Sequence, residues 1–354
     1  MKIILFEDSQ GMAEELLLAL NKAVAGKGEA SLFEPAPGTP PAGTHEARLK
    51  EELSLPRYRD ASLIVVDLDL SKVESYRGLS EPTVRRVTDA LGTPECAYAR
   101  GEEIGDEFVR VAEQRESTIA LSVKAGSAKF ARHVVSVAEG FGYIADQLPT
   151  ALKEPRKKFP GKLLATILGK PEYSEKIALY ASGDQNRLAS VLRVGGTDEE
   201  RRRRLTCLLG YWLWDSVLRY PGVVVNEVAA SSYLNIHEDT FRRTGAVQAL
   251  FEKARYRGPF AEAKGLMWWR GMLDDIVAES GLADGREFAA KQLQQEVPRS
   301  ECCEDPARPA GYYCMLSEKP VSLENSKGGL TWFPRGADLA RVSAKKFEEL
   351  GPWL

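Results

Sequence analysis

Three acidic side chains beside apolar segments are the first residues in this sequence that could do chemistry. Glu7 and Asp8 follow the apolar run 2–6, and Asp67 follows the apolar run 63–66. A carboxylate at the end of a buried strand is costly unless it is paired, hydrated or part of a site. Three such carboxylates can hold a hard divalent cation through oxygen ligands. The residue types therefore indicate a Mg²⁺ site with Glu7, Asp8 and Asp67 as ligands.

A lysine could complete this acidic group. Lys124 follows the segment 117–123, which is the fifth segment with strand character. A lysine ammonium can pair with a carboxylate, or with a phosphoryl group attached to one. Asp69 is the other nearby acid, but its position two residues beyond Asp67 is more typical of a solvated or capping residue.

The elements that must position these residues alternate between strands and helices. The expected strands cover 2–6, 29–35, 62–67, 95–99 and 117–123, and the expected helices cover 11–24, 80–91, 104–114 and 127–148, with an exposed loop rich in Pro and Gly at 35–47. This alternation predicts an α/β fold, a doubly wound parallel sheet with helices on both faces. In such a sheet the carboxyl ends of the strands share one edge, so the acids and Lys124 should gather there.

Three segments of this part of the chain resemble the receiver domains of two-component response regulators. They are LFEDS (5–9), LIVVDLDLS (63–71) and LSVKAG (121–126). The resemblance covers residues 1–148 and implies a flavodoxin-like, receiver-like parallel sheet. A flavodoxin-like domain with ordinary carboxylates at its strand ends is the alternative that the same residues allow.

The resemblance also implies a role for each candidate residue. Glu7 and Asp8 match the acidic pair that binds Mg²⁺ in this family. Asp67 matches the aspartate that accepts phosphate from a histidine kinase, and Lys124 matches the lysine that follows the fifth strand. Phosphorylation would then change the surface that the domain presents to a partner.

The match is atypical at three places. The fourth strand of a receiver domain should end in Ser or Thr, whereas this chain has Ala97 and Ala99 there. The family lysine is usually followed by proline, but Ala125 follows here, and the segment 119–123 before it has no aromatic residue. These departures leave open a receiver-like scaffold or interaction module that works without phosphorylation.

The second half of the chain has a different pattern. Residues 149–160 are basic and contain three prolines, so we expect a linker. Residues 161–354 are expected to form a mainly α-helical output domain with an irregular tail from residue 297. The expected helices are 161–169, 172–181, 184–193, 198–219, 226–234, 238–255, 259–280 and 285–295, with one more starting near Asp338. We recognise no family for this half, and an enzyme with its site in residues 161–354 stays an open alternative.

Residues 225–244 carry the clearest local pattern of this half, VNEVAASSYLNIHEDTFRRT. Two adjacent alanines, a turn at Asn235 and a following helix resemble a bacterial helix-turn-helix segment. The resemblance implies a recognition helix at 238–246, with Arg242 and Arg243 near the phosphates or base edges of DNA. A purely structural pair of helices is the alternative.

The cysteines carry less information. The chain has five of them, widely spaced, which is not a disulfide framework and favours a reducing compartment. Cys302, Cys303 and Cys314 could be combined with His237 as zinc ligands, but their spacing matches no standard zinc-binding pair.

Composition places the chain among folded cytoplasmic proteins. Hydrophobic residues make up 44% of it, which is typical of globular proteins, and no segment approaches the about 20 apolar residues that cross a bilayer. The first residues are also too short an apolar run for a signal peptide. The resemblance of residues 1–148 to receiver domains implies an atypical, Mg²⁺-dependent response-regulator-like signalling protein, with phosphate accepted at Asp67 and a helical domain that binds DNA or protein. A homodimer stays open, and no membrane partner is expected.

Overall fold

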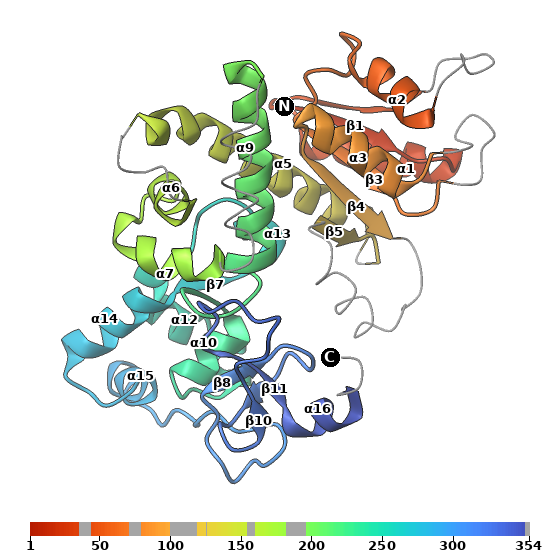
Figure 1. The fold of residues 1–354 in the computed structure, drawn as a ribbon. Helices are drawn as coiled ribbons and strands as arrows, with labels where there is room; N and C mark the ends of the chain where they lie inside the picture. Colours follow the sequence, from red (N-terminus) through yellow and green to blue (C-terminus); the bar gives the residue numbers. More distant parts are fainter. Residues whose placement is uncertain are drawn as a thin grey trace. The chain divides into compact units, whose positions relative to one another are not determined.

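The computed structural model describes residues 1–34, 44–70, 79–99, 119–124, 126–153, 160–181 and 196–350 (Figure 1). These residues form two compact units. The first unit contains the described residues up to 153 together with 196–212, and the second contains 160–181 and 213–350.

The first unit is built on a five-stranded parallel sheet. Its strands are β1 (Lys2–Phe6), β2 (Glu29–Leu32), β3 (Leu63–Asp67), β4 (Glu95–Ala99) and β5 (Ile119–Ser122). They lie in the order β2-β1-β3-β4-β5, and every neighbouring pair is parallel. The predicted α/β fold with a parallel sheet is confirmed.

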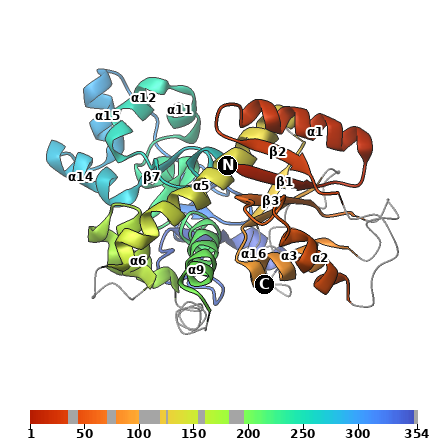
Figure 2. The same ribbon diagram turned by 90° about the horizontal axis from the view of Figure 1, so that it is seen from above.

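Helices cover both faces of this sheet because its central strands are apolar on both sides. Helices α1 (Gln10–Ala23) and α5 (Ser127–Leu152) contact each other on one face, and α2 (His45–Leu53) and α3 (Glu81–Leu91) contact each other on the other (Figure 2). On the second face, Phe6 stacks on Phe33 with ring centroids 4.2 Å apart. Alternate residues of β1 and β3 thus fill two separate hydrophobic layers.

Two elements of the first unit differ from the prediction. Helix α2 begins inside the expected loop 35–47, where the side chain of Thr44 caps it by accepting a hydrogen bond from the Ala47 amide at 3.2 Å. Leu49 and Leu53 of this helix are buried against the sheet. Residues 35–43 of that loop, and the expected helix 104–114, lie outside the described residues.

The expected boundary at residue 148 falls inside a helix. Helix α5 continues to Leu152, with Pro149 within it, because Leu148 and Ala151 are buried and hold the last turn in place. The first four residues of the expected linker, 149–152, are therefore helical. Residues 154–159 lie outside the described residues.

Helix α9 (Asp198–Trp212) belongs to the first unit, although the sequence placed residues 198–219 in the second domain as one helix. The α-helix ends at Trp212, and a π-helical turn, Leu213–Val217, follows it. Gly92, which ends α3 in the left-handed conformation, lies against α9, and a Cβ there would come within 3.0 Å of Arg203 Cβ. The chain thus leaves the first unit after α5 and returns to it in α9.

The second unit combines short helices with two small sheets. Its helices are α6 (Pro160–Ile167), α7 (Ser174–Ala178), α10 (Glu227–Tyr233), α11 (Glu238–Arg243), α12 (Gly245–Leu250), α13 (Ala261–Lys264), α14 (Arg270–Ser280), α15 (Gly285–Leu293) and α16 (Ala344–Leu350). An antiparallel pair is formed by β6 (Val224–Asn226) and β7 (Met267–Trp269). A four-stranded sheet has the order β10 (Ser326–Lys327), β11 (Ala340–Ser343), β8 (Tyr312–Cys314) and β9 (Pro320–Val321).

These sheets correct three predictions. The tail from residue 297 is not wholly irregular, because four of its segments pair as strands. The helix expected near Asp338 begins at Ala344 instead, since 340–343 pairs with β8 as strand β11. The expected helix 259–280 is interrupted by strand β7. The expected helix 184–193 lies outside the described residues, and none of the described helices has both the length and the apolar character needed to span a membrane.

Candidate acidic site at the sheet edge

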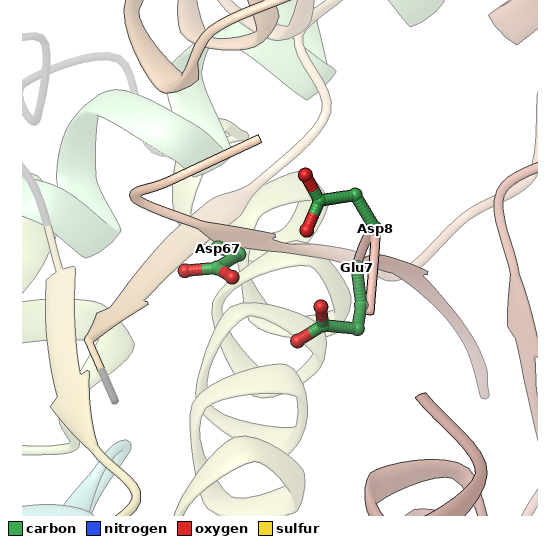
Figure 3. A group of neighbouring side chains, drawn as sticks. All are labelled: Glu7, Asp8 and Asp67. Carbon is green, nitrogen blue, oxygen red and sulfur yellow. The ribbon is translucent and has the colours of Figure 1, made fainter. Parts of the chain in front are cut away.

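Three carboxylates meet where two neighbouring strands end. Strands β1 and β3 are parallel and adjacent, and their register pairs Phe6 with Val66, so the residues that follow lie side by side. The structure brings Glu7, Asp8 and Asp67 together, with one oxygen of each within 4.8 Å of the others. Figure 3 shows the three side chains at this edge of the sheet.

All three acids are buried. Their exposed fractions are 2% for Glu7, 6% for Asp8 and 2% for Asp67. Like charges in a poorly hydrated place repel one another, so such a group requires protons, hydrogen-bond donors or a cation to be stable. Three carboxylates form a donor set of the kind that Mg²⁺ and Ca²⁺ prefer, and they therefore fit a hard divalent cation.

Hydrogen bonds orient two of the acids. Glu7 accepts one from the Ser9 amide at 2.7 Å through Oε1, and one from the Tyr98 hydroxyl at 2.5 Å through Oε2. Asp67 Oδ1 accepts one from the Asp69 amide at 3.1 Å. Asp69 is itself exposed, so its contribution to this site is a backbone donor rather than another buried acid.

Tyr98 is the residue of this site that sequence reasoning missed. It lies in β4 opposite Asp67, it is fully buried, and its ring meets Phe130 of α5 with centroids 5.2 Å apart. The sequence prediction expected Ser or Thr at the end of the fourth strand, where the chain has Ala97 and Ala99. The tyrosine between these alanines carries a hydroxyl that reaches the acidic group, so a phenol within the fourth strand is the signal that could have identified it.

Lys124 lies at the same edge of the sheet but on a different strand. It follows β5, and β4 separates that strand from β3. Lys124 is exposed, and its amide donates to Ser122 Oγ at 3.2 Å. Ala125 lies outside the described residues.

The helix-turn-helix candidate has the expected turn but a shorter second helix. Asn235 adopts the left-handed conformation with φ of 59°, as the turn requires. The expected recognition helix 238–246 ends at Arg243, because Thr244 is extended and α12 starts at Gly245.

Both arginines of this helix are ion-paired. Arg242 contacts Glu227 at 3.1 Å and Glu238 at 2.6 Å, and Arg243 contacts Asp239 at 3.5 Å. Three acids therefore surround two bases on this face. The local charge is unfavourable for a phosphate backbone.

In the part of the chain that the structure describes, no cysteine belongs to a metal-binding group. Within the described ranges, the acidic group is the one set of three or more His, Cys, Asp or Glu side chains whose ligand atoms lie within 4.8 Å of one another. Cys302 and Cys314 are buried and Cys303 is exposed. His237 Nδ1 accepts a hydrogen bond from the Asp239 amide at 3.3 Å, as the cap of α11.

Comparisons with known proteins supply no further assignment. No protein-family model matches the chain, and searches of curated proteins and of solved structures find no match. The function must therefore be inferred from the residues of this chain and their geometry.

Proposed function

We propose that this chain is an atypical, cytoplasmic response-regulator-like signalling protein whose first unit binds Mg²⁺ and accepts a phosphoryl group at Asp67. The observation that carries the proposal is the burial of three carboxylates at the joint carboxyl ends of β1 and β3. A purely structural role would not require three acids within 4.8 Å of one another, because each adds repulsion to the others.

The strand order supports the same proposal. The order β2-β1-β3-β4-β5 is the order of flavodoxin-like folds, and ligands of such folds bind outside the carboxyl ends of the strands, where the order reverses. Here that reversal lies between β1 and β3, which carry Glu7, Asp8 and Asp67. The acidic group therefore lies at the carboxyl ends of β1 and β3, which is where flavodoxin-like folds bind their ligands.

The proposed reaction is a phosphoryl transfer from a phosphohistidine of a kinase. The bond between nitrogen and phosphorus breaks as a carboxylate oxygen of Asp67 bonds to phosphorus. Glu7, Asp8 and Asp67 would hold Mg²⁺, which supplies positive charge for the phosphoryl oxygens. The Asp69 amide holds Asp67 in place, and Lys124, which follows β5 at the same edge of the sheet, would neutralise the added charge.

A phosphorylation-independent receiver-like module is the second candidate, and β4 favours it. Ala97 and Ala99 offer no hydroxyl to a phosphoryl group, and the Tyr98 hydroxyl is directed to Glu7. In this case the acidic site binds a cation for stability, and the first unit recruits a protein partner without a covalent switch.

We propose that the second unit is the output part and that a protein partner suits it better than DNA. Arg242 and Arg243 are already paired with Glu227, Glu238 and Asp239. A DNA-binding helix would have to break these pairs and bring acidic side chains close to phosphate.

Beryllofluoride, which mimics an aspartyl phosphate, tests the proposal. Fluorine NMR of the full chain with Mg²⁺ and beryllofluoride should show a bound signal that disappears in Asp67→Asn. Asp69→Asn is the matched control, because Asp69 is exposed and contributes its amide, which the variant keeps. A signal that survives in Asp67→Asn would contradict phosphorylation at Asp67, whereas Mg²⁺ binding without any signal would favour the second candidate.

A further inference from the structure

Another buried acid lies at the opposite end of the same sheet. Glu95 is the first residue of β4, whereas Glu7 and Asp67 lie at the carboxyl ends of their strands. Its exposed fraction is 3%. Among the described residues, no Lys, Arg or His makes an ion pair with Glu95, so a negative charge on it would be buried without a positively charged partner.

The hydrogen-bond distances around Glu95 indicate whether its carboxyl group is protonated or ionised. Thr88 Oγ1 lies 2.8 Å from Glu95 Oε2 and 2.9 Å from the carbonyl oxygen of Arg85. A hydroxyl has one hydrogen to donate but can also accept. If Thr88 donates to the Arg85 carbonyl, the hydrogen between Thr88 and Glu95 must come from the carboxyl group. Both short distances are thus satisfied when Glu95 is protonated.

The other carboxyl oxygen leads to the same conclusion. Glu95 Oε1 is buried and has no hydrogen-bond partner in the described part of the chain. A buried acceptor that lacks a donor costs far more when it is charged than when it is a neutral carbonyl. Burial is also the largest influence on the pKa of Glu95 and raises it to about 8, although the adjacent Thr88 hydroxyl and the charge of Arg85 act in the other direction.

Helix α9 binds the backbone of this residue, whereas the carboxyl group itself contacts Thr88 of α3. The Tyr211 hydroxyl accepts a hydrogen bond from the Glu95 amide at 2.7 Å and donates one to the Glu95 carbonyl at 3.0 Å. The Tyr211 ring meets Phe141 edge-on, with centroids 5.3 Å apart. The charged and titratable groups that interact with Glu95 are Glu81, Arg85 and Asp89 on α3, Cys96 on β4 and Tyr211 on α9. Of the other groups of α9, Cys207 faces Asp89 and Tyr211 instead, and Arg203 faces Cys207.

We infer that Glu95 is a proton-dependent latch that holds α9 against α3 and β4. The protonated carboxyl is compatible with the closed, dry contact between these elements. Its ionisation requires water or a cation, which the carboxyl reaches when α9 moves away. This inference does not depend on the proposed function, because it involves the other end of the sheet.

The direction of the pH effect follows from the two states of the carboxyl. In the open state the pKa of Glu95 returns towards its ordinary value of 4.5, whereas in the closed state it is about 8. The latch is therefore fully effective below pH 4.5 and weakens as the pH rises to 8. Across this range, each pH unit should increase the population of the open state about tenfold.

Hydrogen exchange of the α9 amides measures this opening. In the full chain, protection factors of α9, corrected for intrinsic exchange, should fall about fiftyfold between pH 6 and pH 8. In Glu95→Gln the decrease should vanish, because the amide side chain can donate to Thr88 and does not titrate. Glu199→Gln is the matched control, since Glu199 lies on α9 but is exposed and paired with Arg202 and Arg203, and it should keep the wild-type decrease.

Two results would overturn the latch. One is a set of wild-type α9 protection factors that do not change between pH 6 and pH 8. The other is a carbon NMR titration in which the Glu95 carboxyl of the native protein has its midpoint below pH 6. Both use the unmodified chain, so the inference can be rejected even if Glu95→Gln does not fold.

Discussion

The hydroxyl of Tyr98 donates a 2.5 Å hydrogen bond to Glu7, from a residue 91 positions away in the sequence. This bond joins β4 to the end of β1 and places a phenol within the acidic group. It is a charge-assisted hydrogen bond in a buried place, so its geometry should affect both stability and cation binding.

Tyr98→Phe should lower the free energy of unfolding by about 1.5–3 kcal/mol without divalent cations, because Glu7 loses a donor while it remains buried. Saturating Mg²⁺ should reduce this loss if Glu7 is a ligand. Urea unfolding with and without Mg²⁺ measures both values. Tyr143→Phe is the control, since Tyr143 is 42% exposed on α5, and it should have little effect. An equal loss of unfolding free energy with and without Mg²⁺ would show that the hydrogen bond from Tyr98 to Glu7 does not affect cation binding.

Asp8→Asn should stabilise the protein when no divalent cation is present. Removing one of three buried charges relieves repulsion worth about 1–3 kcal/mol. The same variant should lose the stabilisation that Mg²⁺ gives to the wild type, which follows from preferential binding to the folded state. Thermal unfolding with EDTA and with Mg²⁺ measures both effects. Asp146→Asn, an exposed site on α5, should change neither, and retained Mg²⁺ stabilisation in Asp8→Asn would exclude Asp8 as a ligand.

Glu95→Gln should raise the free energy of unfolding at pH 8 by about 2–5 kcal/mol and should have little effect at pH 4.5. The reason is that the native pKa of Glu95, about 8, lies above its unfolded value of 4.5. Between these two pH values the folded wild type keeps a proton that the unfolded chain releases, so its free energy of unfolding falls as the pH rises. Urea unfolding at four pH values between 4.5 and 8 gives the difference. A benefit independent of pH would assign the effect to packing rather than ionisation.

Gly222→Ala should destabilise the second unit by about 3 kcal/mol or more. A Cβ at this position would overlap the carbonyl oxygen of Gly336 and the hydroxyl of Tyr180. That hydroxyl donates to the Tyr220 carbonyl at 3.0 Å and accepts from the Val223 amide at 3.1 Å, so the contact cannot yield easily.

Gly245→Ala is the matched control for this change, because a Cβ there meets no atom within 4 Å and lies at the start of α12. Calorimetry of the two variants compares them directly. A Gly222→Ala protein as stable as the wild type would show that the segment around Gly336 can move away without cost.

Much of the fold of the first unit could be predicted from local patterns. The continuous apolar runs of β1 and β3 are typical of strands buried on both faces, and the alternation with helices led to a parallel sheet. Helix α2 was missed because its sequence, HEARLKEEL, is highly charged and follows a stretch rich in Pro and Gly. Its two buried leucines, Leu49 and Leu53, indicate a helix only when the sheet that they cover is known.

The second unit was harder to predict because its strands are two to four residues long. Such segments have no measurable periodicity, and they become strands through pairing with distant partners. Residues 340–343 illustrate this, since their conformation depends on β8, about 25 residues earlier in the chain.

The sequence by itself determined which acids can share a site, because parallel strands bring their carboxyl ends to one edge and Glu7, Asp8 and Asp67 end such strands. Tertiary structure alone decided what surrounds each acid. The contact of Tyr98 with Glu7 depends on the register of β4, and the burial of Glu95 depends on α9, which comes more than a hundred residues later. Hydrogen bonding and hydration are properties of the folded surroundings, so no local pattern could show that one buried acid has donors while another favours a proton.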